Sequence, residues 1–436
     1  VEAAASARNR AGAGIDETFA RWVQLLEVMA GRSTYVALLD EYPRALARVI
    51  RLLGAGRWPS EYLSRHPVLL DELLDERIAD EAFGAERLRA WAERLDAELR
   101  QAGDDTERLM NLLREAPHAQ VFRLLMADLD GRLGVEALAD QLSALADATL
   151  DLSLAALWRL QRGEQAPAPR LAVVGYGKLG GKELGYASDL DLIFVYDDPD
   201  PESPTVYAQL VRRWVNWLST PTSSGVLFDI DMRLRPNGNA GLLVSSMDAF
   251  SRYQLAADGR GAWTWEHQAL TRARACAGDR QLGQRIEALR RRVLSQPRDA
   301  GALAADVLAM RARMLQGHPN RSALFDLKHD RGGMVDIEFA VQFLVLAHAS
   351  RHPELLDNLG NIALLRIAAD LGLIDPGAAQ ATALAYRHYR LLQHGLRLNG
   401  AEFARIEHAE VASHIEAVRT LWRSVFGTDA PVPGDG

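Results

Sequence analysis

Residues 171–197, LAVVGYGKLGGKELGYASDLDLIFVYD, contain the pattern that decides the fold. An apolar run leads into a glycine-rich turn, and a short connection leads to a second apolar run that opens with Asp189 and Asp191. Successive side chains of a strand point to opposite faces, so these two carboxylates should share one face while Leu190 and Leu192 point into a core. Two carboxylates beside a glycine turn are suited to a divalent cation with a polyphosphate.

The same stretch also fits the fingerprint of dinucleotide-binding proteins. Gly175, Gly177 and Gly180 match G-x-G-x-x-G after a strand, and Asp197 follows about twenty residues later. That fold places a helix of roughly a dozen residues between two parallel strands. Only residues 182–188 separate the glycines from the second strand, so we reject the dinucleotide interpretation.

A third carboxylate is found in residues 228–235, FDIDMRLR. Apolar and polar residues alternate over the whole stretch, which predicts a half-buried strand. Its polar face would carry Asp229 and Asp231 at one end and Arg233 and Arg235 at the other. The alternation does not decide which aspartate joins the first pair, and an ordinary solvated strand face has the same pattern.

Nucleotidyl transfer would explain why such residues gather. Its transition state has a crowded anionic phosphorus centre, and two magnesium ions about 3.5–4 Å apart can bind the attacking and leaving oxygens. Magnesium prefers carboxylate and water ligands, which three aspartates from two strands could supply. The amides of Gly180 and Gly181 could bind the triphosphate of ATP. Its charge could be neutralised by Lys178, Arg233 and Arg235.

Five motifs make a more specific assignment, and the matches around them span roughly residues 35 to 370. In chain order they are YLSRHPVLLDELLD, GYGKLGGKELGYASDLDLIFVY, IDMRLRPNGNAGLLVSS, AWTWEHQALTRARA and DRGGMVDIEF. Together they resemble the glutamine synthetase adenylyltransferase family of bacterial nitrogen control. The resemblance implies an α+β fold that is mostly helical overall. In it, a mixed-sheet nucleotidyltransferase core, similar to the DNA polymerase β superfold, lies between N- and C-terminal helical domains.

The resemblance also implies roles for individual residues. Asp189 and Asp191 would be the paired metal ligands, and the D-x-R-L-R-P motif makes Asp231 the third. Many members of the superfold have Gly-Ser at the phosphate turn. This chain has Gly180 and Gly181 there, as is usual in this family, which removes a hydroxyl donor to phosphate.

Full-length members of the family carry two such cores. One attaches AMP from ATP to a tyrosine of glutamine synthetase, and the other removes it by phosphorolysis. The signature GGKELGYASDLD occurs once and the chain starts with Val1, so we expect one half of such a protein. The signature resembles the C-terminal copy, which implies the adenylylating half and release of pyrophosphate. Deadenylylation stays open on physical grounds because one metal site serves both directions.

The resemblance implies three partners for the chain: glutamine synthetase, the PII signal protein and glutamine as an effector. A second alternative is therefore a regulatory module that binds PII or glutamine and has lost catalysis. The intact set of three carboxylates argues against that alternative.

Composition narrows the class of protein. The 436 residues are 48% hydrophobic, enough for two or three domains with substantial cores. A net charge of −8 argues against a nucleic-acid substrate, which favours a basic surface. Cys276 is the single cysteine, which fits a reducing cytoplasm. We find no uncharged apolar run of about 18 residues, so we expect no membrane association.

Hydrophobic periodicity predicts three regions: N-terminal helices over residues 1–137, the nucleotidyltransferase core over 138–280 and C-terminal helices over 281–436. Residues 17–160 show helical spacing throughout. We expect helices at about 138–162, 205–219, 286–314, 335–349, 361–371, 376–398 and 410–426.

Two segments have more than one interpretation. Gly332 and Gly333, before a helix, could offer amides to an anion, with Lys328 or Arg331 reaching phosphate, or could simply begin a well-capped helix. Glu266 and the neighbouring histidine, residue 267, could act as a base or be structural, so the general base is not assigned.

Overall fold

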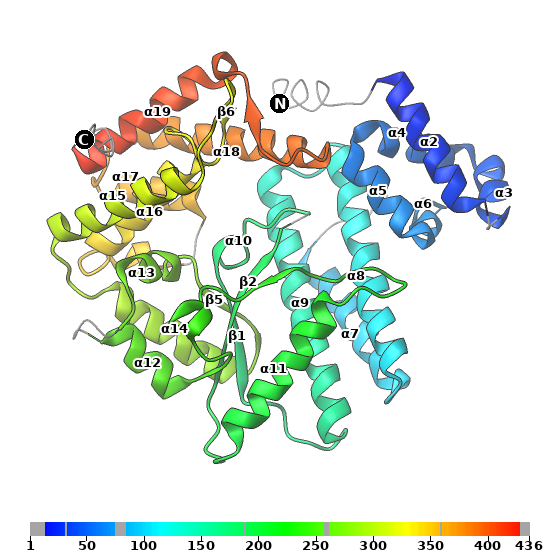
Figure 1. Cartoon of the computed structure of the whole chain (residues 1–436), viewed down its shortest axis with the longest axis horizontal. Coiled ribbons are helices and arrows are strands. Elements are labelled where there is room, and N and C mark those ends of the chain that lie inside the picture. Colours follow the sequence, from blue (N-terminus) through cyan, green and yellow to red (C-terminus); the bar gives the residue numbers. More distant parts are fainter. Residues whose placement is uncertain are drawn as a thin grey trace.

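The structure, a computed structural model, describes residues 14–30, 33–74, 84–186, 188–256, 261–357 and 360–427. Helices dominate this part of the chain, and a small mixed sheet lies among them (Figure 1), which confirms the predicted fold class. The N-terminal helices are α2 (Ile15–Met29), α3 (Ser33–Glu41), α4 (Pro43–Ala55), α5 (Arg57–Arg65), α6 (Leu70–Leu74), α7 (Ala85–Ala102), α8 (Thr106–Leu129) and α9 (Val135–Arg162).

The central sheet has the strand order β3-β2-β1-β5, with β4 paired to the other end of β2. Its strands are β1 (Leu171–Gly175), β2 (Leu190–Tyr196), β3 (Ile230–Asp231), β4 (Ser245–Ser246) and β5 (Arg274–Gly278). β1 runs antiparallel to β2 and β5, whereas β3 and β4 run parallel to β2. The glycine turn between β1 and β2 contains the short helix α10 (Gly177–Gly180) and connects two antiparallel strands, unlike the dinucleotide fold.

Side chains of β2 alternate between two hydrophobic clusters. Leu190 and Leu192 are fully buried in the cluster shared with α7, α8, α9 and α11 (Ser203–Ser219), as the sequence predicts. Ile193 and Val195 point to the other face, in the cluster shared with the C-terminal helices. Because side chains alternate along a strand, Asp191 lies on this second face. The predicted acidic site therefore faces the C-terminal half of the molecule.

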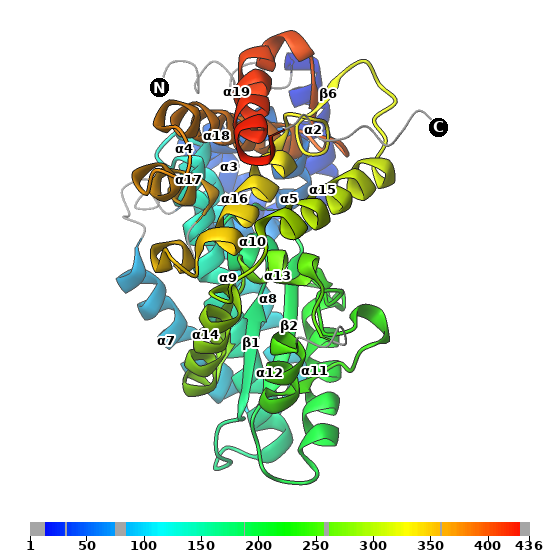
Figure 2. The ribbon, with the colours of Figure 1, turned by 90° about the vertical axis from the view of Figure 1, so that its left-hand side faces the viewer.

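The C-terminal helices pack over the end of the sheet that carries α10 (Figures 1 and 2). Helices beyond α11 are α12 (Met247–Leu255), α13 (Thr264–Leu270), α14 (Arg280–Leu294), α15 (Ala300–Gly317), α16 (Met334–His348), α17 (Asn361–Asp370), α18 (Pro376–Leu398) and α19 (His408–Phe426). A second small sheet pairs β6 (Phe325–Asp326) with β7 (Arg405–Ile406). The sequence predicts α9, α11 and α17 to α19 within a few residues.

Three predicted elements differ from the structure. The single helix expected over 286–314 is two helices, because Pro297 lies in the break between α14 and α15. The helix predicted as amphipathic at 335–349 is α16, which is buried on nearly every side. The domain boundaries after residues 137 and 280 stay a prediction, and residues 1–13 and 428–436 of the outer regions lie outside the described residues.

The strand predicted over residues 228–235 is the third difference. Only Ile230 and Asp231 pair with β2, and the chain then turns. The backbone amide of Arg233 donates to Asp231 Oδ1 at 2.8 Å, a local bond that competes with continued strand pairing. The apolar residues of the stretch still contact the core clusters, so the alternation identified the buried face but not the length of the strand.

A buried arginine fixes the segment that leads into β3. The Arg114 side chain on α8 is almost completely buried and donates to the carbonyls of Trp217 and Thr220 at 2.7 Å and Gly225 at 2.8 Å. These carbonyls belong to the end of α11 and the loop after it. Arg114 therefore satisfies the carbonyls at the end of α11 and adds a second bond to the carbonyl of Gly225, which also accepts from the amide of Thr222 at 3.0 Å.

Arg114→Met should lower the free energy of unfolding by about 3–5 kcal/mol, because several carbonyls would be buried without donors. Urea unfolding followed by circular dichroism measures this change. Arg94→Met, at an exposed position of α7, is the control and should change stability by less than about 0.5 kcal/mol. Equal stability of the two variants would contradict the role of Arg114.

Candidate active site

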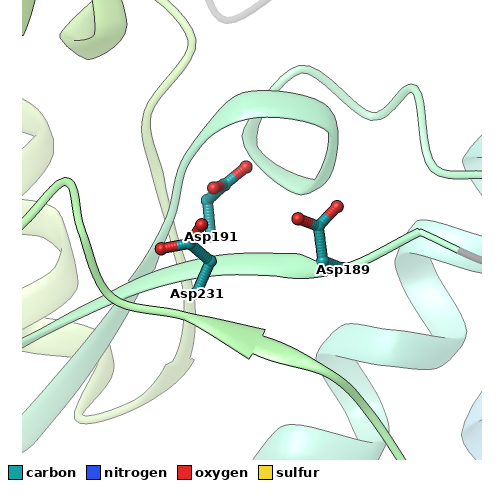
Figure 3. Close-up of side chains that lie close together, drawn as sticks. All are labelled: Asp189, Asp191 and Asp231. Carbon is teal, nitrogen blue, oxygen red and sulfur yellow. The ribbon is translucent and has the colours of Figure 1, made fainter.

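Three aspartates meet at the edge of the sheet beside α10. Asp191 of β2 lies in register with Asp231 of the parallel strand β3, and Asp189 comes directly before β2. Each residue offers a carboxylate oxygen that lies within 4.8 Å of the other two (Figure 3). The sequence predicts the same three residues as a group, and the structure brings them together. Three hard oxygen donors at this spacing fit a divalent cation of the magnesium or manganese type.

The electrostatics of the group are unfavourable without a cation. Burial and the nearby charges of Asp189 and Asp231 raise the pKa of Asp191 to about 6. Gly177, at φ 54°, lies directly against this carboxylate: a Cβ there would be 2.3 Å from Asp191 Oδ2. The glycine is therefore needed for close approach and for its backbone conformation.

Arg233 lies at the site but contacts an aspartate. Its Nε donates to Asp231 Oδ2 at 2.7 Å, and its side chain is otherwise largely exposed. Hydrogen bonds from Arg233 lower the pKa of Asp231. Arg233 therefore holds one carboxylate of the triad in its charged form, and a cation would compete with it for Asp231.

Arg235 binds backbone carbonyls in this structure, and its contact with phosphate stays a prediction. Its guanidinium donates to the carbonyls of Met232 at 2.8 Å, Asn239 at 3.1 Å and Gly241 at 3.2 Å. These bonds close the turn after β3, which gives Arg235 a structural role. The sequence pattern did not reveal this, because the carbonyl partners depend on the path of the loop.

Gly180 and Gly181 have backbone partners as well, and phosphate binding by their amides stays a prediction. Their amides donate to the carbonyls of Tyr176 at 2.9 Å and Gly177 at 3.0 Å, so these two donors are already used within the turn. A Cβ on Gly180 would be 1.8 Å from the carbonyl oxygen of Arg272, and one on Gly181 would be 2.6 Å from its guanidinium. The pair lets the turn pack closely against Arg272.

A cavity of about 320 Å³ adjoins the acidic group on the side of Asp189. Its cations come from separate parts of the chain: Lys178, Lys328, Arg390 and Arg397. Burial and the charge of Lys328 lower the pKa of Lys178, whose Nζ lies 3.4 Å from Ser188 Oγ. This arrangement of positive charges next to three carboxylates suits a polyphosphate with its cation.

The sequence predicts two of these cations, Lys178 and Lys328, and misses the two arginines. Arg390 and Arg397 lie seven residues apart on α18, on a face that also carries Tyr386 and Gln393. Polar residues at this spacing on a partly buried helix are a recognisable signal. Deciding that they face the glycine turn requires the fold. A larger cavity, of about 810 Å³, lies on the other side of Glu183 and has no member of the acidic group in its lining.

The two segments left open by the sequence have structural roles. The amide of Gly332 donates to Asp336 Oδ2 at 2.6 Å, and that of Gly333 donates to the carbonyl of Asp330 at 2.9 Å. This is the well-capped helix, and the anion site proposed for these amides is not formed. The buried carboxylate of Glu266 accepts from the Tyr253 hydroxyl at 2.9 Å and from the amide of Trp263 at 2.8 Å, which closes the start of α13.

No helix in the described parts of the chain has both the length and the apolar content needed to cross a membrane.

Two protein-family profiles match the chain. The one described as glutamate-ammonia ligase adenylyltransferase matches residues 46–289, more than half of the chain. That stretch includes the sheet and all three aspartates. The one described as GlnD PII-uridylyltransferase matches residues 302–403, which contain the loop that carries Lys328 and the helix that carries Arg390 and Arg397.

Curated relatives are similar over nearly the whole chain. It is 54% identical over 416 residues to the bifunctional glutamine synthetase adenylyltransferase/adenylyl-removing enzyme of Burkholderia mallei, which covers 94% of this chain and 44% of that protein. Proteins of the same name match from Ralstonia nicotianae (54% identity, 96% of this chain, 44% of that protein) and Aromatoleum aromaticum (53%, 95% and 43%). The chain spans less than half the length of these relatives.

The raised pKa of Asp191 predicts a gain in stability when its charge is removed. The folded protein holds this proton up to about pH 6, whereas the unfolded chain loses it near pH 3.8. Stability without metal therefore falls as pH rises between these values. In EDTA at pH 7.5, Asp191→Asn should be more stable than wild type by about 1–3 kcal/mol, and the difference should vanish near pH 4.

Denaturant unfolding at several pH values measures this difference, with the exposed Asp229→Asn as the control. Magnesium should stabilise wild type and Asp229→Asn but not Asp191→Asn. An Asp191→Asn variant that is less stable than wild type in EDTA at pH 7.5 would contradict the electrostatic description.

Proposed function

The chain belongs to the glutamate-ammonia ligase adenylyltransferase family, and we propose that it transfers AMP from ATP to a tyrosine of glutamine synthetase, with release of pyrophosphate. The observation that carries this proposal is the acidic group of Asp189, Asp191 and Asp231 beside a cavity lined by cations. Hard oxygen ligands beside a cavity with several cationic side chains, at one sheet edge, are what a nucleotidyl transfer requires. We propose the cytoplasm, where ATP is available, as its location.

Magnesium is the proposed metal, in two copies, with Asp189, Asp191 and Asp231 as its protein ligands. When bound, it would neutralise phosphate charge and favour the ionised tyrosine hydroxyl. Asp191 is the innermost of the three and Asp189 is the most exposed, so Asp189 borders the nucleotide cavity. Release of Asp231 from Arg233 would free both of its oxygens for the metal and leave Arg233 near the leaving phosphates.

ATP would bind with its phosphates in the 320 Å³ cavity. Lys178 reaches this cavity from the glycine turn, Lys328 from the loop before α16, and Arg390 and Arg397 from α18. Charge-assisted hydrogen bonds from several directions would neutralise the charge of the triphosphate and fix its orientation. Correct orientation matters because the attacking and leaving oxygens must lie roughly in line at phosphorus.

The adenylylating direction rests on the resemblance of GGKELGYASDLD to the C-terminal copy of the family's signature. The same metal site could run the reverse reaction, in which phosphate removes AMP from the tyrosine. The curated relatives carry both activities in their name, so deadenylylation is the second candidate. By the same resemblance, we propose the PII signal protein and glutamine as regulators.

The reaction itself can be tested with the isolated chain, unmodified glutamine synthetase, ATP and magnesium. Mass spectrometry should detect one added AMP per modified tyrosine. Failure of wild type to add AMP, together with phosphate-dependent loss of AMP from adenylylated glutamine synthetase, would overturn the proposed direction in favour of the reverse reaction.

Replacing a proposed metal ligand should abolish this transfer while the fold survives. Asp189→Ala and Asp231→Ala should each lower the rate by roughly a thousandfold or more, because each removes a ligand of the metal that activates the reaction. Asp229→Ala is the matched control: it is one residue before β3, exposed, and outside the acidic group. Similar losses in Asp229→Ala and Asp231→Ala would refute the assignment.

The cationic cavity generates a separate prediction about ATP binding. Lys328→Met and Arg397→Met should each raise the KM for ATP by roughly 10- to 100-fold, since a hydrogen bond to a charged group contributes about 1.5–3 kcal/mol. Arg366→Met, in the lining of the larger cavity, should leave this KM unchanged. Steady-state kinetics at varied ATP decide the matter, and an equal effect of all three variants would count against this cavity as the nucleotide site.

A further inference from the structure

A buried polar network connects the glycine turn to the C-terminal helices. Its members come from five separate places in the chain: Glu183 after α10, Arg272 before β5, Glu338 of α16, Asn361 of α17 and Tyr386 of α18. Arg272 forms an ion pair with Glu183 and a second one with Glu338 at 3.2 Å. The Tyr386 hydroxyl lies 2.7 Å from Glu183 Oε2 and accepts from Asn361 Nδ2 at 2.9 Å.

The centre of this network is largely buried, whereas Glu338 at its edge is 24% exposed. The side chains of Glu183 and Arg272 are 7% and 9% exposed, and Tyr386 is completely buried. Burial raises the pKa of Glu183 and is the largest single effect, but the charges of Arg272 and Arg390 and the hydrogen bond from Tyr386 together outweigh it, so the net shift is downward. A buried ion pair is no more stabilising than well-packed apolar residues of similar volume, so its stability alone does not explain its presence here.

Glu183 is tied to the proposed site through the backbone of the turn. Its amide donates to the carbonyl of Lys178 at 2.7 Å. Gly181 packs on the guanidinium of Arg272, and Gly177 packs on the carboxylate of Asp191. A displacement of Glu183 would therefore move both Lys178 and the surface against which Asp191 is held.

Tyr386 ties the same network to the other wall of the cavity. It lies on α18, one turn before Arg390 and three turns before Arg397. The cations proposed to bind ATP thus belong to two parts of the structure: Lys178 to the glycine turn, and Arg390 and Arg397 to α18. The hydrogen bond between Tyr386 and Glu183 joins residues 203 positions apart and links the glycine turn directly to α18.

We infer that Glu183, held by Arg272 and Tyr386, is a positioning residue that fixes the glycine turn relative to α18. With the turn fixed, Lys178 and the arginines of α18 can bind the triphosphate together, next to Asp191. This inference rests on the proposed function. Glu183 touches neither metal nor phosphate in this role: it acts through Lys178 and through the surface of the turn. Loss of the link should impair alignment more than folding, because misplacement by about 1 Å can lower a rate by roughly a hundredfold.

Tyr386→Phe and Tyr389→Phe form a matched pair for the test. Both tyrosines are completely buried on α18, and each variant loses one hydroxyl. That of Tyr386 bonds Glu183 and also contacts Asn361 and Glu338, whereas that of Tyr389 donates to the carbonyl of Gly332 at 3.0 Å. Both variants should stay folded, and the melting temperature of Tyr386→Phe should fall further because its hydroxyl has more partners. In AMP transfer, Tyr386→Phe should lower kcat by about 10- to 100-fold with the KM for glutamine synthetase unchanged, and Tyr389→Phe should lower neither parameter more than about twofold.

Glu183→Gln provides a second variant that keeps the shape of the side chain. It should lower kcat as Tyr386→Phe does, and the double variant should be no worse than the poorer single one, because both changes break the same link. Additive losses in the double variant, or equal kcat values for Tyr386→Phe and Tyr389→Phe, would overturn the inference. Should Glu183→Gln fail to fold, the tyrosine pair still decides.

The outcomes separate this inference from the proposed function. A wild-type chain that transfers no AMP in either direction contradicts the proposed function. In that case, titration calorimetry with ATP and magnesium still tests the link, since Tyr386→Phe should weaken ATP binding by about tenfold or more and Tyr389→Phe should not. Equal affinities of the two variants would refute the positioning role of Glu183.

Discussion

Repulsion among the carboxylates of Asp189, Asp191 and Asp231 is the constraint around which this end of the molecule is built. Like charges at this spacing oppose the folded state, and the raised pKa of Asp191 reflects that cost together with burial. The parallel register of β2 and β3 nevertheless places Asp191 beside Asp231. A cation is the simplest way to offset the repulsion, so we expect a bound cation to stabilise this part of the fold.

The surroundings of the triad follow from the same constraint. Position 177 requires glycine because a Cβ there would collide with the carboxylate of Asp191. Arg233 partly neutralises the charge of Asp231. The other cationic side chains line the cavity beyond Asp189. There they could bind phosphate without forming ion pairs with the proposed metal ligands. The proposed metal and nucleotide sites are thus separate but adjoining.

Local sequence patterns were sufficient wherever short-range physics decides the structure. Period-two alternation predicted which residues of β2 are buried and that Asp189 and Asp191 share a face, and helical spacing predicted α11 and α18 closely. Alternation did not predict the length of β3. The strand ends after two residues, where the side chain of Asp231 accepts a hydrogen bond from the backbone amide of Arg233. The helix expected over 286–314 failed for a local reason that the sequence does contain, namely Pro297.

Long-range contacts could not be predicted in this way. The sequence singled out Gly180 and Gly181 as phosphate ligands but did not reveal that the fold packs them against Arg272, which is about ninety residues away in the chain. Arg235 was assigned to phosphate for its charge, and its contacts with carbonyls depend on the path of the loop. Residues that join distant elements, such as Tyr386, carry no local signal of their partner, so the network around Glu183 became visible only in three dimensions.

Anomalous diffraction from crystals grown with manganese and a non-hydrolysable ATP analogue tests the central claim most directly. The account predicts manganese peaks bridged by the carboxylates of Asp189, Asp191 and Asp231, with the triphosphate of the analogue extending into the cavity of Lys178, Lys328, Arg390 and Arg397. Manganese bound elsewhere, with the three carboxylates empty beside a bound nucleotide, would contradict it.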